Sequence, residues 1–296
     1  MSEINQDKID RLLKRLRNCN LCPRNCKVNR LEGVRGICGQ TSQIRIASAN
    51  LHFGEEPPIS GEKGSGTIFM TGCNLKCVYC QNYPISQMNT GADISPLTLV
   101  DKMLELQKRG AHNINFVTPT HFGAQIAEAI FNARKRGLTV PIVYNTSGYE
   151  KVEILRELEG LIDIYMPDMR YGDSEAAECY SNAPDYPEVN RTAIAEMYRQ
   201  VGELTMDEDD IAVRGLLIRH LILPNKLSKT EEIFKFIAEQ ISENTYISLM
   251  SQYFPAYRAA EFEKINRRII KKEYLIAKKL MEKYNLTNGW MQDEIL

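Results

Sequence analysis

Short apolar stretches recur along most of the chain, and each is followed by a segment with the apolar spacing of a helix. The run TIFMTG (67–72) predicts a strand. The segment SPLTLVDKMLELQKRG (95–110) predicts a helix, since Ser95 can cap its first turn and Gly110 can end it. Further strands are predicted at 44–48, 113–119, 139–148, 161–170, 211–224 and 245–253, and further helices at 121–137, 149–160, 190–204 and 228–241.

This alternation decides the fold class. Strands that alternate with helices of about 10–15 residues predict a parallel sheet, because a parallel pair needs a crossover long enough to hold a helix. We count about six such units, too few for a closed eight-stranded barrel. An α/β fold is therefore expected, either an open doubly wound sheet or a partial barrel. Both place ligands at the carboxyl ends of strands, so we look for chemistry in the residues that follow each strand.

The two ends of the chain differ from this repeating part. Residues 5–17 predict a short charged helix, which is followed by a cysteine-bearing loop. Residues 259–284 predict a long amphipathic helix that packs on the outside of the sheet. We therefore divide the chain into a cysteine-rich metal-binding segment, 1–54, and a larger domain, 55–296, that holds the strand–helix units.

Composition and charge narrow the function classes. Hydrophobic residues make up 43% of the chain and charged residues 25%, as is ordinary for a folded globular protein. With 37 Lys and Arg against 38 Asp and Glu, the net charge of −1 gives no overall field that attracts nucleic acid or an anionic membrane. The first twenty residues lack the apolar core of a signal peptide, and no apolar stretch reaches the roughly 18 residues that span a bilayer. We expect a cytoplasmic protein without nucleic-acid or membrane partners.

Cysteines are the chemical signal. Cys73, Cys77 and Cys80 form a C-x3-C-x2-C array just past the first strand of the repeating part. In a reducing compartment, clustered thiols are more often metal ligands than disulfides. A closed structural zinc site uses four ligands and this array offers three, whereas a [4Fe–4S] cluster held by three cysteines keeps one iron open for catalysis. The array therefore favours an iron–sulfur cluster over zinc.

At this point a family resemblance emerges. The pattern C-x3-C-x-aromatic-C, with Tyr79 as the aromatic residue, resembles the signature of the radical S-adenosylmethionine (SAM) superfamily. The flanking text PISGEKGSGTIFMTGCNLKCVYCQNYPIS (58–86) resembles the branch that activates glycyl radical enzymes and is similar to pyruvate formate-lyase activating enzyme. The resemblance implies a partial (β/α)6 barrel and an oxidoreductase. In this family SAM chelates the open iron, one electron cleaves its sulfonium C–S bond, and the resulting 5′-deoxyadenosyl radical abstracts hydrogen from a substrate.

The resemblance also implies contacts with SAM at the strand ends. The family's glycine-glycine-glutamate segment, which meets the methionine amino group largely through its backbone, aligns with residues 118–120. Its Asp-Thr-Asn-Gly stretch near the ribose aligns with residues 145–148, and its Asp-Leu-Lys with residues 168–170. Two arginines at these ends could pair with the methionine carboxylate or with substrate. The positions so implied are Tyr79, Thr118, Pro119, Thr120, Asn145, Thr146, Ser147, Asp168, Arg170 and Arg219.

Departures from the family pattern keep the substrate open. Thr118 and Pro119 replace both glycines, and Asn145 replaces an acid with a neutral group that can still bond a ribose hydroxyl. The leading expectation is a glycyl radical enzyme as the protein substrate, with flavodoxin or ferredoxin as electron donor. The alternative is radical chemistry on a small molecule or a peptide. No catalytic side chain is assigned.

A second cysteine group precedes the first. Cys19, Cys22, Cys26 and Cys38 form C-x2-C-x3-C-x11-C, and four such ligands suffice for zinc or for a second iron–sulfur cluster. In activating enzymes with ferredoxin-like clusters, the extra cysteines usually follow the radical motif, whereas here they precede it. A different class of protein, a zinc-dependent interaction module, would use both groups as structural sites and would hold zinc in each.

Overall fold

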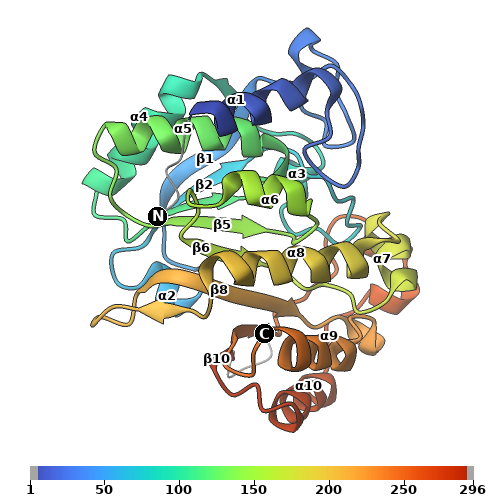
Figure 1. Cartoon of the computed structure of the whole chain (residues 1–296). Coiled ribbons are helices and arrows are strands. Elements are labelled where there is room, and N and C mark those ends of the chain that lie inside the picture. Colours follow the sequence, from blue (N-terminus) through green and yellow to red (C-terminus); the bar gives the residue numbers. More distant parts are fainter. Residues whose placement is uncertain (1–5, 292–296) are drawn as a thin grey trace.

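A mixed β-sheet forms the framework of the protein, whose computed structural model describes residues 6–291 (Figure 1). Within these residues the strand order is β10-β9-β8-β6-β5-β4-β2-β1-β3, and β7 pairs with β8 off this path. The strands are β1 (Ile44–His52), β2 (Ser65–Met70), β3 (Ala92–Ile94), β4 (Ile114–Val117), β5 (Ile142–Thr146), β6 (Ile164–Pro167), β7 (Thr205–Met206), β8 (Ala212–Leu221), β9 (Tyr246–Met250) and β10 (Gly289–Met291).

The strand order distinguishes between the two expected architectures. From β2 to β10 the neighbouring strands are parallel and follow one another in chain order, while β1 and β3 add an antiparallel edge. Right-handed crossovers that all advance in one direction place their helices on one face of the sheet. A doubly wound sheet needs a reversal of strand order, and none occurs along this path. The α/β fold is therefore of the partial-barrel type.

Helices cover the outer face of this sheet. Figure 1 shows α4, α5, α6 and α8 side by side across the strands, with α9 and α10 beyond β8. The α-helices are α1 (Gln6–Lys14), α2 (Pro57–Ser60), α3 (Tyr83–Ser86), α4 (Pro96–Lys108), α5 (Gly123–Lys135), α6 (Val152–Leu158), α7 (Ser174–Ser181), α8 (Tyr186–Val201), α9 (Thr230–Phe236) and α10 (Lys271–Lys283). Ser95 caps α4 as expected, because its hydroxyl accepts the Thr98 N–H at 3.0 Å.

The C-terminal helix is shorter than its periodicity predicts. Residues 259–265 form two 3-10 turns, and the helix begins only at Lys271. Glu273 accounts for this start, since its carboxylate accepts the Ile270 N–H at 2.9 Å and pairs with Arg267 at 2.8 Å. Among residues 6–291, no helix is long and apolar enough to cross a membrane.

The inner face of the sheet is apolar at one end and polar at the other. Because side chains alternate along a strand, Leu217 of β8 faces inward while Ile218 packs in the outer core. The inner apolar cluster consists of Ile59, Val143, Ile164, Met166, Ala212, Leu217 and Tyr246. Towards the carboxyl ends of the strands, Asn145, Asp168 and Arg219 replace apolar side chains. The polar end is therefore where ligands are expected.

The cysteine-rich segment shares the core of the larger domain. A single outer cluster joins buried side chains from Leu12 to Leu286, and β1 pairs with β2 in the same sheet. The guanidinium of Arg24 donates to the main-chain carbonyls of Asn74, at 2.7 Å, and Asn182, at 2.5 Å. The boundary drawn near residue 54 thus falls just after β1, inside a continuous sheet.

Candidate functional site

The three radical-motif cysteines lie in the loop that follows β2. Gly72 turns the chain there with φ 87°, and a Cβ at this position would lie 2.6 Å from the Cys38 carbonyl oxygen, so glycine is required. Cys73 and Cys77 are buried, and Cys80 is partly buried. The loop therefore presents its thiols at the carboxyl end of the parallel strands.

Hydrogen-bond donors surround the Cys77 sulfur. Arg170 Nη1 donates to it at 3.3 Å and Ser181 Oγ at 2.9 Å. The Ser181 hydroxyl is bonded in turn to Tyr171 at 2.7 Å, and the Tyr171 and Tyr79 hydroxyls are 2.6 Å apart. Donors of this kind stabilise a thiolate and tune the reduction potential of an iron–sulfur cluster. Tyr79 is itself buried, so its hydroxyl completes this chain below the cavity.

The donor set fits an iron–sulfur cluster. Burial raises the pKa of Cys73 to about 12 and also raises the pKa of Cys80, so these ligands lose their protons only when a cation compensates. Within the described residues, no three His, Cys, Asp or Glu side chains form the ligand set of a single metal ion. A [4Fe–4S] cluster binds one cysteine per iron, so its three cysteines need not meet at one ion. A cavity of 180 Å³ opens beside Cys80.

A buried carboxylate organises the charges in this cavity. Asp168 accepts from Arg170 Nη2 at 2.6 Å and from Arg219 Nε at 2.9 Å. Burial by itself would raise the pKa of Asp168, but the two guanidiniums outweigh burial and hold this pKa below its ordinary value. Asp168 therefore stays ionised and fixes both arginines at the mouth of the barrel.

The two arginines differ in their free donors. Arg219 contacts Asp168 through Nε, Asn145 Oδ1 through Nη2 at 2.7 Å, and Glu55 Oε2 through Nη1 at 3.5 Å. The Nε of Arg170 has no hydrogen-bond partner among residues 6–291, although it is buried. Arg170 thus keeps a donor for a bound carboxylate, whereas each nitrogen of Arg219 already faces an acceptor. The assignment of either arginine to SAM stays a prediction.

Residues 118–120 present backbone rather than side chains. Thr118 has φ 59°, the left-handed conformation that glycine adopts readily and a β-branched residue rarely does. The position thus has a backbone geometry that glycine would adopt without strain. Thr120 is buried and donates its hydroxyl to Glu150 at 2.5 Å. Pro119, its neighbour in the chain, is also buried. A contact of Thr120 with a ligand would therefore use its backbone.

Residues 145–147 divide between the two faces of the sheet. Asn145 faces Arg219 at the barrel mouth, whereas Thr146 donates to Glu150 on the other side. The hydroxyl of Ser147 is buried and has no hydrogen-bond partner in the part of the chain that the structure describes, so it remains available to a ligand. Sequence reasoning missed Glu150, a fully buried acid whose pKa burial raises to about 7. The roles of Asn145 and Ser147 at a nucleoside stay predictions.

Sequence reasoning also missed a second part of the cavity. Glu55 and Glu56, between β1 and α2, line a space of 290 Å³ together with Trp290 of β10. The Pro and Gly content of their segment predicts a loop. That composition does not predict that two glutamate side chains of the loop face the inside of the barrel. Two adjacent glutamates directly before two prolines were the only local signal.

The N-terminal cysteines gather in their own loop. Cys19, Cys22 and Cys38 are buried and Cys26 is partly buried, and all eight cysteines of the chain are free thiols. Burial, together with the charges of the other three cysteines, raises the pKa of Cys22 to about 12. The close approach of Gly36, where a Cβ would lie 2.9 Å from the Cys26 sulfur, keeps this loop tight. A second metal here stays a prediction.

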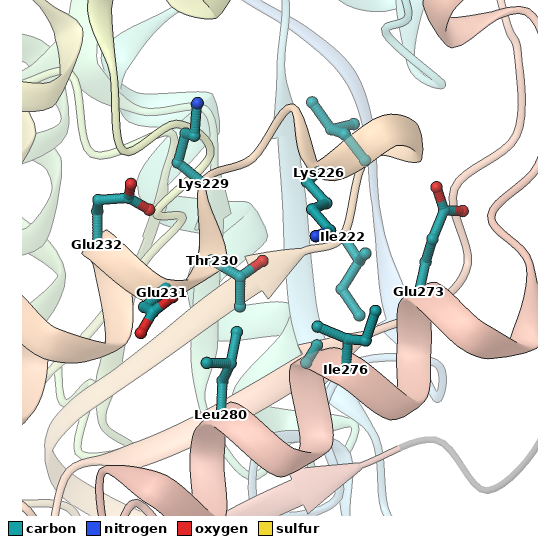
Figure 2. Close-up of a pocket in the computed structure, with 11 residues that line it drawn as sticks. Ile222, Lys226, Lys229, Thr230, Glu231, Glu232, Glu273, Ile276 and Leu280 are labelled. Carbon is teal, nitrogen blue, oxygen red and sulfur yellow. The ribbon is translucent and has the colours of Figure 1, made fainter.

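A further pocket lies outside the barrel, between α9 and α10. It has a volume of 270 Å³, and Figure 2 shows Leu280 of α10 pointing toward Thr230 across it. Two of its acids are already paired, Glu231 with Lys283 and Glu273 with Arg267. It shares no lining residue with the cavity beside Cys80, and we do not include it in the site.

Comparison with known proteins identifies the family. The model of the radical SAM superfamily matches residues 67–237, which contain the cysteine loop, most of β2 and the strands from β3 to β8. The chain belongs to the radical SAM superfamily. Among curated relatives, the uncharacterized protein MJ0674 of Methanocaldococcus jannaschii is 34% identical over 280 residues, which cover 91% of this chain and 76% of that protein. The uncharacterized protein MJ0808 of the same organism is 21% identical over 263 residues, which cover 82% and 72%.

Solved structures share the radical SAM fold. HydG, a maturase of the [FeFe]-hydrogenase, superposes with a TM-score of 0.52 at 13% identity, covering 97% of this chain and 66% of its own. A radical SAM methyltransferase from Sphaerobacter thermophilus superposes with a TM-score of 0.50 at 14% identity, covering 76% and 66%. The chain thus spans just under two thirds of both structures, and at these identities they show the fold alone. Membership of the superfamily implies a [4Fe–4S] cluster and SAM as cofactors.

Proposed function

We propose that this radical SAM protein holds its [4Fe–4S] cluster through Cys73, Cys77 and Cys80 and reductively cleaves SAM. The observation that carries the proposal is the position of these thiols, at the carboxyl end of β2 and beside a cavity bounded by Arg170 and Arg219. When bound, the cluster supplies the electron that cleaves the sulfonium C–S bond and gives a 5′-deoxyadenosyl radical.

The side chains of the protein orient and shield this chemistry. Arg170 links the Cys77 sulfur to Asp168, so the cysteine loop and the end of β6 keep a fixed relative position. The buried hydroxyls of Tyr79, Tyr171 and Ser181 close the space behind the loop and leave no room there for bulk water. Exclusion of water protects a reactive intermediate from side reactions.

The reaction that follows cleavage is the finer part of the proposal. Activation of a glycyl radical enzyme, with flavodoxin or ferredoxin as the electron donor, is supported by the sequence flanking the radical motif, residues 58–86. Radical chemistry on a small molecule or a peptide is favoured by a specific observation, the enclosed acidic space next to Glu55 and Glu56. The superfamily match weighs against the zinc-dependent interaction module for the radical-motif cysteines.

Anaerobic reconstitution tests the proposal. The full chain is loaded with iron and sulfide, reduced with dithionite in the presence of SAM, and analysed for metal content and 5′-deoxyadenosine. We expect 5′-deoxyadenosine from the wild type and from Cys179→Ala, because Cys179 is exposed. Cys77→Ala should abolish the product and the radical-motif cluster. Zinc at both cysteine groups, or product from Cys77→Ala, would refute the proposal.

A further inference from the structure

The cavity beside the cysteines continues into a second space on the inner face of the barrel. We call this space, lined by Glu55, Glu56, Asn145, Arg219 and Trp290, the acidic lobe; its volume is 290 Å³. It shares Arg219, Met250 and Gln252 with the 180 Å³ cavity next to Cys80. The acidic lobe is therefore continuous with the space where the radical chemistry is proposed.

Glu56 is a buried carboxylate with an unused oxygen. Glu56 is 4% exposed, and its Oε2 has no hydrogen-bond partner within the part of the chain described by the structure. The backbone holds Glu56 in place, because its carbonyl accepts the N–H groups of Ile59 at 2.8 Å and Ser60 at 3.0 Å. Ile59 belongs to the inner apolar cluster, so the turn that aims Glu56 is anchored in the core. An ionised carboxylate in such a place is unfavourable unless a cation or donors meet it.

The lining of the lobe mixes acidic and basic side chains. Glu55, Glu56, His52 and Arg219 all line it. Arg219 already pairs with Asp168 at 2.9 Å and lies 3.5 Å from Glu55, and burial raises the pKa of Glu55 to about 7. The unpartnered oxygen of Glu56 is therefore the position on this wall where a hydrogen-bond donor is missing.

One row of inner-face side chains crosses β8, β9 and β10, and two of its members, Arg219 and Trp290, line the lobe. Arg219, Ser248 and Trp290 are paired in register across β8, β9 and β10, and paired residues of parallel strands point to the same face. The Ser248 hydroxyl is fully buried and has no partner among the described residues. The indole of Trp290 offers a face of the kind that attracts cations.

We infer that the acidic lobe binds a cationic group, a primary ammonium or a guanidinium, on the substrate that gives up hydrogen. The carboxylate of Glu56 supplies the charge and Trp290 a π-face, a combination that suits a compact cation with several N–H donors. The identification of the ligand as substrate rests on the proposed function. The cation preference rests on the lobe alone.

The single tryptophan of the chain makes the lobe directly observable. Trp290 is the only tryptophan, so intrinsic fluorescence reports on this space. The reconstituted full chain is titrated with agmatine and butylamine as small cations, and with butanol as the neutral control. An arginine tripeptide blocked at both ends and its citrulline counterpart distinguish a peptide side chain from a free amine.

We expect a saturable fluorescence change with the cations and none with butanol or the citrulline peptide. Glu56→Gln should weaken cation binding at least tenfold, while Glu62→Gln, an exposed acid nearby on the chain that does not line the lobe, should leave it unchanged. The melting temperature of Glu56→Gln should not fall, because the substitution replaces a buried carboxylate oxygen that has no hydrogen-bond partner among the described residues. If that variant fails to fold, a melting temperature of the wild type that rises with agmatine and not with butanol is the deciding measurement.

Three results would overturn the inference. The first is an equal fluorescence response to cations and to neutral probes, and the second is an unchanged cation affinity in Glu56→Gln. The third is a loss of SAM binding in Glu56→Gln without a loss of cation binding, which would assign the lobe to the cofactor. Formation of 5′-deoxyadenosine is measured on the same samples. Cation binding without cleavage would refute only the proposed function, and cleavage without cation binding would refute only the lobe.

Discussion

Asp168 is the residue whose replacement tests the site most sharply. Asp168→Asn removes the charge that holds Arg170 at 2.6 Å and Arg219 at 2.9 Å, and leaves two buried guanidiniums with a neutral partner. Two charge-assisted hydrogen bonds are worth about 1.5–3 kcal/mol each, and breaking a buried ion pair by removing one partner costs about 3–5 kcal/mol. Because asparagine keeps one carbonyl acceptor, we expect a loss near the lower end, about 3 kcal/mol, in the free energy of unfolding at neutral pH.

Urea unfolding of the full chain under anaerobic conditions measures this loss. The control is Asp93→Asn, which removes another Asp–Arg pair at 3.1 Å whose aspartate is 56% exposed. Exposed pairs contribute about 0–1 kcal/mol, so this variant should differ little from the wild type. Equal effects of the two substitutions would refute the view that burial gives the Asp168 pair its energy.

The pH dependence gives an independent check on Asp168. Its pKa in the folded protein lies below the ordinary value, because Arg219 and Arg170 outweigh the effect of burial. A carboxyl with a depressed pKa stabilises the fold above its unfolded pKa of about 3.9, and this contribution is lost as pH falls further. The difference between the wild type and Asp168→Asn should therefore be constant down to about pH 5 and shrink below pH 4. A difference that grows on acidification would contradict the assigned sign.

Three further outcomes follow from the site. Cluster loading should improve as pH rises above neutrality, since burial raises the pKa of Cys73 to about 12 and ligation needs the thiolate; iron incorporation that falls with pH would contradict this. Arg170→Met should weaken SAM binding by roughly tenfold, and more than Arg219→Met does, because of the two arginines only Arg170 keeps a nitrogen without a hydrogen-bond partner among the described residues. If equilibrium dialysis gave the opposite order, Arg219 would be the arginine that binds the methionine carboxylate of SAM. Thr118→Gly should leave the free energy of unfolding unchanged or raise it by up to about 1 kcal/mol, because glycine adopts the left-handed φ of 59° more readily than threonine. A lower free energy of unfolding in urea would show that the threonine side chain contributes to stability.

The repeating part of the fold could be predicted because its signals are local. Each strand of the parallel series from β2 to β9 and the helix capped by Ser95 follow from apolar spacing and capping residues in one short window, whereas β10 is not predicted. His220 likewise behaves as a satisfied core residue, with its ring nitrogens bonded to the Met169 carbonyl at 2.7 Å and the Thr230 hydroxyl at 3.0 Å. Local patterns left the doubly wound sheet and the partial barrel equally open, because strand order is set by pairing between distant segments.

The inner polar residues could not be predicted for the same reason. Glu55 and Glu56 face the cavity because Ile59 anchors the following turn in the inner cluster, and no local pattern reveals that contact. Trp290 reaches the site only because β10 adds to β9 far along the chain. The radical-motif cysteines are the exception, since their three thiols lie within eight residues and need no distant partner to signal a ligand set.

The guanidinium of Arg24 ties the N-terminal cysteine loop to the radical loop through main-chain oxygens alone. Its acceptors are the carbonyls of Asn74, Ser181 and Asn182, and one of these residues lies between Cys73 and Cys77. Every amino acid offers the same carbonyl, so substitutions at the three acceptor positions that keep the local backbone leave the bonds intact. The three acceptor residues can therefore change during evolution without loss of these hydrogen bonds. Arg24 itself cannot be replaced in this way, because lysine would keep the charge but lose the planar guanidinium that donates to several oxygens at once.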